Sequence, residues 1–143
     1  MIEVLRLGAP QLEWAWAEER LAASHNYWLA TVSPDGRPHT MPVWAVWLDG
    51  RLLFSCGARS HKARNLAADA RCTMTTESAS EAVVVEGVAS VVQQGARAAF
   101  VEAYRAKYDW DMSADTGPVF AIAPQVVFAF CEFPDRAPGR PTR

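Results

Sequence analysis

Residues 34–66 read PDGRPHTMPVWAVWLDGRLLFSCGARSHKARNL, and this stretch decides the fold of the chain. It contains two Asp-Gly pairs, Asp35-Gly36 and Asp49-Gly50, each flanked by strand-forming residues. An Asp-Gly pair in that setting is the strongest short-range signal for a β-hairpin. We therefore expect three consecutive antiparallel strands, over Trp28–Ser33, Pro38–Leu48 and Arg51–Cys56.

The middle strand of this predicted set contains a proline. Strand alternation places two sets of side chains on opposite faces: His39, Met41, Val43, Ala45 and Trp47 on one, and Thr40, Pro42, Trp44 and Val46 on the other. Pro42 has no N–H to donate, so its strand lies at an edge, at a bulge, or beside something that replaces a neighbouring strand. A flat ligand would be such a replacement.

A basic helix start follows the third strand. Ser60 has the position of an N-cap for a helix that runs through Ala68. Arg59, Lys62 and Arg64 crowd this N-terminus, where the helix macrodipole disfavours cations. Free N–H groups, the Ser60 hydroxyl and three cations together predict a phosphate or carboxylate site. The alternative is that the three cations form an ordinary solvated face.

Composition limits the class of protein. The chain has 143 residues, half of them hydrophobic, and we read it as a single domain with a net charge of −2. That charge argues against a general nucleic-acid binder. We find neither a signal peptide nor an apolar run of bilayer-spanning length, and we expect a cytoplasmic protein without membrane partners.

Cysteine and histidine spacing indicates neither a metal site nor a disulfide framework. Cys56, Cys72 and Cys131 are odd in number and include no CxxC pair, so we expect three buried thiols. The three histidines, His25, His39 and His61, lack metal-binding spacing.

The rest of the chain supplies flanking elements. An N-terminal helix is expected over about residues 10–23, with Pro10 in its first turn, and a second helix over 96–108. The aromatic stripe Phe100, Tyr104 and Tyr108 on the second helix favours core packing. Strands are expected over 72–76 and 82–92, with a last strand or strand pair over 119–122 and 126–133, before a tail at 134–143 that frays. The order of elements predicts a mainly β protein, a single antiparallel barrel with helices over its openings.

The segments LATVSPDGRPHTMPVWAVW (29–47), DGRLLFSCGARSHKARNL (49–66), CTMTT (72–76) and VVVEGVASVV (83–92) carry a family resemblance. Together they resemble the pyridoxamine 5'-phosphate oxidase-like superfamily of flavin-reductase-type split barrels. Within it, the chain is most similar to small proteins that bind the deazaflavin coenzyme F420. The resemblance implies a six-stranded antiparallel split β-barrel that forms a homodimer, with two equivalent cofactor sites at the subunit interface.

Carried over by position, the resemblance also implies a binding site. The strand around Thr40, Met41, Pro42, Val43 and Trp44 would lie along the deazaflavin or isoalloxazine ring, and Ser55, Arg59, Ser60, Lys62, Arg64 and Asn65 would hold the phosphate. Tyr27, Trp44 and Trp47 would shape the substrate side. No catalytic acid or base stands out, which suits a reaction in which the cofactor carries the reactive atom.

Three functions remain open at this stage. The first is an F420-dependent oxidoreductase that transfers a hydride between the deazaflavin and a small organic acceptor. The second is an FMN-dependent oxidase or reductase of the same fold. The third is a non-catalytic cofactor-binding dimer.

Overall fold

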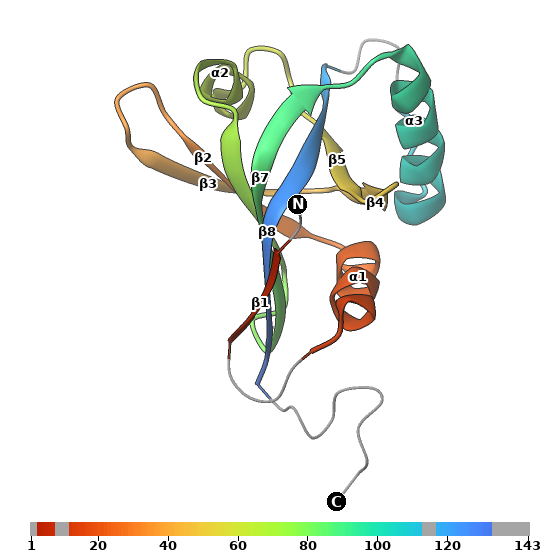
Figure 1. Ribbon diagram of the computed structural model, residues 1–143. Helices are drawn as coiled ribbons and strands as arrows, with labels where there is room; N and C mark the ends of the chain where they lie inside the picture. The colour runs from red at the N-terminus through yellow and green to blue at the C-terminus, as the bar shows by residue number, and fades with distance from the viewer. Residues whose placement is uncertain (1–2, 8–11, 113–116, 133–143) are drawn as a thin grey trace, which may run out of the picture.

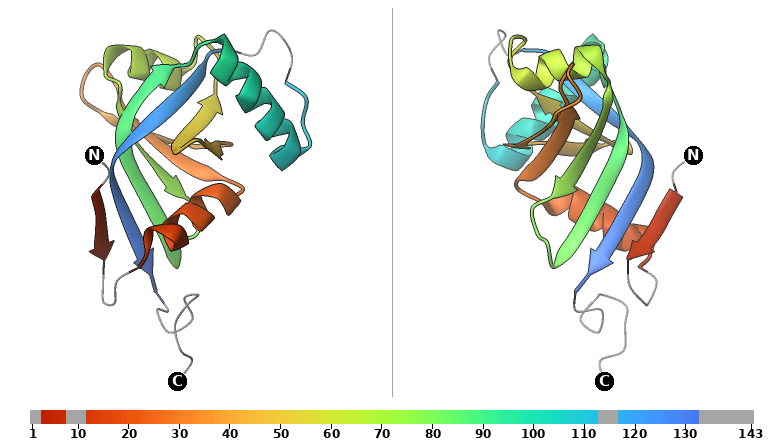
Figure 2. Two further views of the ribbon diagram at one scale, coloured as in Figure 1. Left: turned by 45° about the vertical axis from the view of Figure 1, so that its right-hand side comes forward. Right: turned by 90° about the vertical axis from the view of Figure 1, so that its left-hand side faces the viewer.

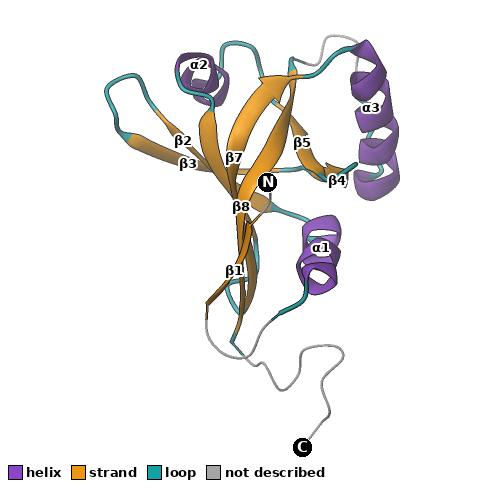
Figure 3. Cartoon of the chain, viewed as in Figure 1, coloured by secondary structure: helices purple, strands orange, loops and turns teal. Residues whose placement is uncertain are grey.

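The computed structural model describes residues 3–7, 12–112 and 117–132. Among them, eight strands form one curled sheet, and three helices lie around it (Figures 1 and 3). The strands are β1 Glu3–Leu7, β2 Tyr27–Val32, β3 Pro38–Val43, β4 Val46–Leu48, β5 Arg51–Ser55, β6 Arg71–Thr76, β7 Glu81–Val91 and β8 Val119–Cys131. The helices are α1 Trp14–Ala23, α2 His61–Ala68 and α3 Gln94–Tyr108.

The strand order explains the curl. Seven strands follow the path β3-β2-β6-β7-β8-β5-β4, with antiparallel neighbours throughout, and β1 adds a parallel strand against β8. The split-barrel prediction is confirmed in class, but the predicted count of six strands is wrong. One extra strand is β1, for which we predicted nothing. The other arises because the predicted strand Pro38–Leu48 is divided into β3 and β4.

The predicted strand Pro38–Leu48 is two strands with a two-residue break. β3 pairs with β2, whereas β4 pairs with β5, and Trp44 and Ala45 lie between them. Because β3 and β4 are the two ends of the strand order, these two residues carry the chain from one edge of the sheet to the other. We call Trp44-Ala45 the crossing. Pro42 therefore lies on an edge strand, one of the positions that its missing N–H predicted.

The turns and caps agree with the local sequence signals. Gly36, Asp49 and Gly50 have positive φ of 86°, 52° and 75°, as tight hairpin turns require. The Ser60 hydroxyl accepts a hydrogen bond from the Ala63 N–H at 3.2 Å, which confirms the predicted N-cap. The predicted start of α1 at Pro10 and the tail at 134–143 lie outside the described residues.

The last strand is one element and not a pair. β8 runs for 13 residues, and a β-bulge interrupts its ladder with β7, where Glu86 pairs with Val126 but Gly87 pairs with Pro124. A Cβ on Gly87 would lie 2.3 Å from the Ala123 carbonyl oxygen. The bulge therefore depends on glycine at this close approach of two strands.

The core lies inside the curl of the sheet. Leu29, Met74, Val85 and Val127 occupy paired positions on four neighbouring strands, and all are fully buried. A second, smaller cluster joins Val46, Leu53 and Phe100 between α3 and the β4–β5 hairpin. Figure 2 shows α1 and α3 on the same side of the long β7–β8 pair. Among the described residues, no helix combines the length and apolar character needed to cross a bilayer.

Candidate functional site

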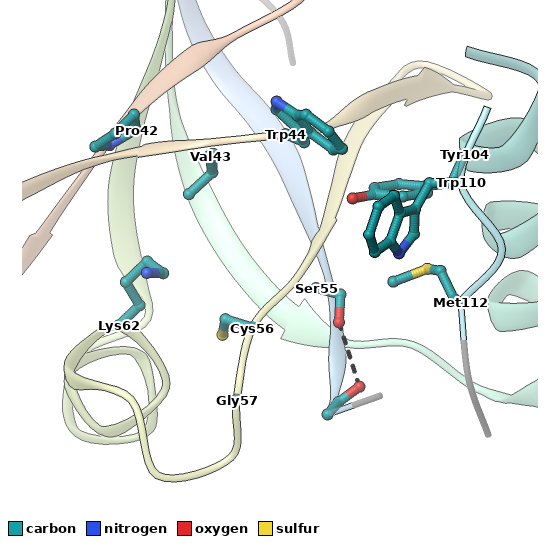
Figure 4. A pocket seen from close by; sticks show the side chains of 11 residues that line it. Pro42, Val43, Trp44, Ser55, Cys56, Gly57, Lys62, Tyr104, Trp110 and Met112 are labelled. Carbon is teal, nitrogen blue, oxygen red and sulfur yellow. Dashed lines mark hydrogen bonds between the residues drawn. The ribbon is translucent and has the colours of Figure 1, made fainter. Parts of the chain in front are cut away.

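A pocket of about 430 Å³ lies in the gap of the split barrel, between β3 and β5. These strands do not pair with each other: β3 is one end of the strand order, and β5 is the last strand but one at the other end, between β8 and β4. Figure 4 shows β3 along one side of the pocket and β5 with the following loop along the other. The lining residues are Pro42, Val43, Trp44, Ser55, Cys56, Gly57, Lys62, Tyr104, Trp110, Met112 and Gly117.

One end of the pocket is cationic. The Lys62 side chain extends from α2 toward β3, and within the described part of the chain it forms no ion pair (Figure 4). The Ser60 hydroxyl accepts the hydrogen bond of the Ala63 N–H. The first two N–H groups of α2, those of His61 and Lys62, have no acceptor among the described residues. An unpaired ammonium group beside free N–H groups is suited to hold an anion.

The floor of the pocket is a close contact between two backbone segments. A Cβ on Gly117 would lie only 2.2 Å from the Cys56 carbonyl oxygen, so the Ser55–Gly57 loop rests directly on Gly117. Ser55 Oγ and Arg97 Nη1 both donate to the Gly117 carbonyl, at 3.5 and 3.1 Å. A Cβ on Gly57, in contrast, would meet nothing within 4 Å.

Cys56 corrects one of our predictions. We expected three buried thiols, and Cys72 and Cys131 are buried, but Cys56 is half-buried and lines the pocket. Burial raises the pKa of its thiol, although a hydrogen bond with Ser60 and the Lys62 charge oppose that effect. The thiol is therefore protonated at neutral pH and is not an activated nucleophile.

The other end of the pocket is aromatic. Tyr104, Trp110 and Met112 face the cavity from α3 and the segment after it (Figure 4). We predicted core packing for the stripe Phe100, Tyr104 and Tyr108. Phe100 is fully buried, as predicted, but Tyr104 also lines the pocket.

Trp44 forms part of the wall between these two ends. Its ring stacks on Tyr108, with centroids 4.4 Å apart and an interplanar angle of 2°. Its Nε1–H donates to Asn26 Oδ1 at 3.0 Å, and Asn26 Nδ2 in turn donates to Glu77 at 3.1 Å. The Trp44 ring is thus held on one face and at its edge, as a rigid wall for a flat ligand requires.

The crossing is held by side chains from α3. The Ala45 N–H donates to the Tyr108 hydroxyl at 3.0 Å, and Lys107 Nζ donates to the Ala45 carbonyl at 2.9 Å. Backbone groups that a continuous strand would pair with a neighbour are paired here with side chains. This is the physical reason that the predicted strand divides at Trp44-Ala45.

The structure brings part of the predicted site together. Pro42, Val43, Trp44, Ser55 and Lys62 line the pocket. The other predicted residues do not line it: Thr40, Met41, Arg59 and Arg64 are exposed, Ser60 caps α2, and Asn65 is buried.

Asn65 and two aromatic residues have structural contacts. Asn65 Nδ2 donates to Thr31 Oγ1 at 3.0 Å and so fastens α2 to β2. Tyr27 and Trp47, which we expected on the substrate side, do not line the pocket either. Tyr27 is fully buried, and Trp47 Nε1 donates to Glu18 at 3.1 Å.

Sequence reasoning missed Cys56, Gly57, Tyr104, Trp110, Met112 and Gly117. Most of them come from a loop or from the segment at and after the end of α3, where no local pattern marks a pocket. A signal existed for Tyr104 alone, in the aromatic stripe that we assigned to the core.

The lining favours binding over acid–base chemistry. Its titratable groups are Lys62, Cys56 and Tyr104, and burial raises the pKa of the Tyr104 phenol. The lining residues include no carboxylate. Among the described residues, no three His, Cys, Asp or Glu side chains lie close enough together to hold a metal ion. The lining therefore offers a cation at one end and aromatic side chains at the other.

Comparisons with known proteins give one family match and several solved structures of similar fold. The family model described as pyridoxamine 5'-phosphate oxidase matches residues 15–131. A search among proteins of curated function found no match. Solved structures of similar fold include a conserved hypothetical protein from Mycobacterium tuberculosis, with 23% identity, a TM-score of 0.76, and coverage of 92% of this chain and 90% of that one.

Two further structures illustrate how differently this fold is used. An F420 reductase aligns with 23% identity and a TM-score of 0.63, over 77% of this chain and 94% of that one. The heme storage protein HutZ from Vibrio cholerae aligns with 18% identity and a TM-score of 0.64, over 80% of this chain and 89% of that one. At such identities the likeness extends to the fold alone.

Proposed function

Because the chain belongs to the pyridoxamine 5'-phosphate oxidase family, we propose that it is an oxidoreductase that uses coenzyme F420 to transfer a hydride to or from a small organic molecule. The observation that carries the proposal is the pairing of two surfaces in one pocket. Lys62 and the start of α2 offer a cationic end, and Pro42, Val43 and Trp44 offer an adjacent flat wall. A phosphate joined to a planar ring system needs two surfaces of these kinds.

The residues would divide the work of binding. Lys62 and the free N–H groups of α2 would hold the phosphate, with Ser55 at the pocket floor. The β3 residues would lie along the ring, and Pro42 leaves no N–H unpaired there. When bound, the deazaflavin supplies the hydride-transfer chemistry, and the chain positions the ring and excludes water.

The predicted residues outside the lining keep a part in this proposal. Arg59 and Arg64 are exposed cations close to the start of α2, where they add to the positive potential that an anionic cofactor meets. Thr40 and Met41 extend the β3 wall. Ser60 and Asn65 act through the helix, since one caps it and the other anchors it to Thr31.

We further propose a homodimer with the pocket beside its interface. Trp28, Thr75, Val84 and Phe128 occupy paired positions on the outer face of four neighbouring strands, and none of them is buried. Trp28 is 49% exposed and pairs directly with the pocket residue Pro42. A second copy on this apolar face would cover Trp28 and border the pocket.

FMN is the alternative cofactor. Lys62 is the single cation in the pocket lining, which fits one phosphate without the acidic tail of F420. The absence of a carboxylate from the lining also keeps open a non-catalytic cofactor-binding dimer, in which ligand binds but no acceptor is reduced.

A fluorescence titration of the purified protein with F420, FMN and heme in parallel tests these options. Preferential binding of F420, followed by oxidation of reduced F420 with an acceptor, supports the proposed enzyme. Preferential binding of FMN supports the alternative flavoenzyme, and binding without turnover supports the non-catalytic dimer. Binding of neither F420 nor FMN refutes the proposal.

A matched pair of variants tests the cationic end of the pocket. Lys62→Ala should weaken cofactor binding by about 1.5–3 kcal/mol, the worth of a charge-assisted contact. Arg64→Ala, two residues away and outside the lining, should weaken it less. The double variant should lose a few kcal/mol while its unfolding free energy changes little. Unchanged cofactor affinity in the double variant would mean that Lys62 and Arg64 do not bind the phosphate and belong to an ordinary solvated face.

A further inference from the structure

Lys107 is a partly buried lysine that the pocket chemistry does not use. It lies in the last turn of α3, and no carboxylate within the described ranges is close enough for an ion pair with it. Its ammonium group lies over the rings of Tyr27 and Tyr108, 4.7 and 5.2 Å from their centroids. An amine in such a setting is costly to bury, so its contacts require an explanation.

The hydrogen bonds of Lys107 converge on the crossing. Nζ donates to the Ala45 carbonyl at 2.9 Å and to the Tyr27 hydroxyl at 2.7 Å, and that hydroxyl donates to the Leu21 carbonyl. One ammonium group thus links three elements: the crossing, the start of β2 and the end of α1. The neighbouring residue, Tyr108, accepts the Ala45 N–H and stacks on Trp44.

We propose that Lys107 is a positioning residue for the pocket: by holding the Ala45 carbonyl it fixes the crossing, and with it the Trp44 wall. Its effect on ligand binding rests on the proposed function, whereas its effect on Trp44 does not. Without this contact, the Ala45 carbonyl at the strand break keeps only the Tyr108 hydroxyl as a donor from α3, 2.9 Å away, and the single proton of that hydroxyl is shared with the His25 carbonyl at 2.7 Å. Trp44 then keeps its contacts with Tyr108, Asn26, His25 and Tyr104, but the backbone that carries it has lost one of its bonds to α3.

The charge of Lys107 gives this role a pH dependence. Burial lowers the pKa of Lys107 to about 8, while Glu77 acts in the opposite direction. The ionisable groups that face this region are Tyr27, Tyr108, His25 and Glu77. Burial raises the pKa of Tyr108 to about 12 and that of Tyr27 further, so neither hydroxyl titrates near pH 8. The Lys107 bond to Ala45 is charge-assisted below about pH 8 and weakens above it.

Fluorine NMR of protein labelled with 5-fluorotryptophan measures the Trp44 environment directly. The chain has six tryptophans, and a Trp44→Phe variant assigns the Trp44 resonance. We expect Lys107→Met to shift or broaden that resonance and Lys107→Arg to restore it. Arg105→Met is the matched control, because it removes an exposed cation from the same helical turn without touching the crossing. FMN and F420 affinities should fall about tenfold in Lys107→Met alone.

The wild-type protein provides a test that does not depend on a folded variant. Its Trp44 resonance should move between pH 7 and 9 with a midpoint near 8, and this movement should be absent in Lys107→Arg. A pH-independent Trp44 resonance in the wild type, or an unaltered one in folded Lys107→Met, overturns the positioning role. If neither cofactor binds the wild type but Trp44 still responds to Lys107, only the proposed function falls. If cofactor binds wild type and Lys107→Met equally, only the positioning role falls.

Discussion

Gly117 offers the sharpest test of how the pocket floor is built. Replacing it with alanine adds a Cβ 2.2 Å from the Cys56 carbonyl oxygen and 3.1 Å from the Ala58 nitrogen. Ordinary carbon–oxygen contacts lie about 1 Å farther apart than the first of these distances. Since the obstructing atoms are backbone, a side-chain rotation cannot relieve the clash, and the Ser55–Gly57 loop must move.

The expected cost follows from this geometry. Overpacking a well-packed site costs about 1–3 kcal/mol, and a backbone clash places Gly117→Ala toward the upper end of that range. Displacement of the loop also moves Ser55 and opens the floor under the ligand, so cofactor affinity should fall together with stability. Urea unfolding followed by circular dichroism measures the first effect, and a fluorescence titration measures the second.

Gly95→Ala is the matched control for this substitution. A Cβ at Gly95 meets nothing within 4 Å, and Gly95 lies in the first turn of α3 and does not line the pocket. Alanine there should leave affinity unchanged and stability equal or higher by up to about 1 kcal/mol. A Gly117→Ala protein as stable as the wild type, with the same dependence on urea, would refute the close contact that we describe.

Three further predictions concern individual side chains. Asn65→Ala should lower the unfolding free energy by about 1–3 kcal/mol, because it leaves the buried Thr31 hydroxyl without its hydrogen-bond partner. The control variant Arg64→Ala, at an exposed position, should stay within about 0.5 kcal/mol of the wild type. Urea unfolding of both variants decides whether Asn65 is structural. Cys56 should react with a disulfide reagent more slowly than free cysteine at pH 7.5, because burial raises the pKa of its thiol. Bound FMN should slow the reaction further, since Cys56 lines the pocket. Equal reaction rates with and without bound FMN would contradict the place of Cys56 in the pocket. Burial lowers the pKa of Lys107 to about 8 from 10.5. Above pH 8 the unfolded chain therefore binds more protons than the folded chain, and the unfolding free energy should rise with pH. In urea unfolding, the wild type should gain on the order of 1 kcal/mol relative to Lys107→Met between about pH 7.5 and 9.5.

Much of the fold could be predicted because its signals are local. The hairpin turns at Asp35-Gly36 and Asp49-Gly50, and the cap at Ser60, depend on residues within a few positions of one another. Pro42 indicated an edge strand for an equally local reason, its missing N–H. These features do not require knowledge of what packs against them.

The errors in the prediction have long-range causes. β1 forms by parallel pairing with β8, which lies more than a hundred residues later in the chain. Parallel strands are not joined by a tight turn, so no local turn sequence predicts this pairing. The break at Trp44-Ala45 is made by Tyr108 and Lys107, which belong to a helix near the other end of the chain. In both cases the deciding partner is absent from any local window.

The signals that pointed to the candidate site in the sequence are local as well. A sheet that curls without closing leaves a gap beside the edge strand β3 and beside the last residues of β5, Phe54 and Ser55, which lie beyond the β4 pairing that ends at Leu53. The chain must manage that gap locally, with Pro42 on one side, and with the capped, cationic start of α2 on the other. Such compensations are visible in the sequence because they violate ordinary preferences: a proline within a strand, and cations at a helix N-terminus. The aromatic end of the pocket needs no such violation, since Tyr104 and Trp110 also suit a core or a surface, and this is why the sequence concealed it.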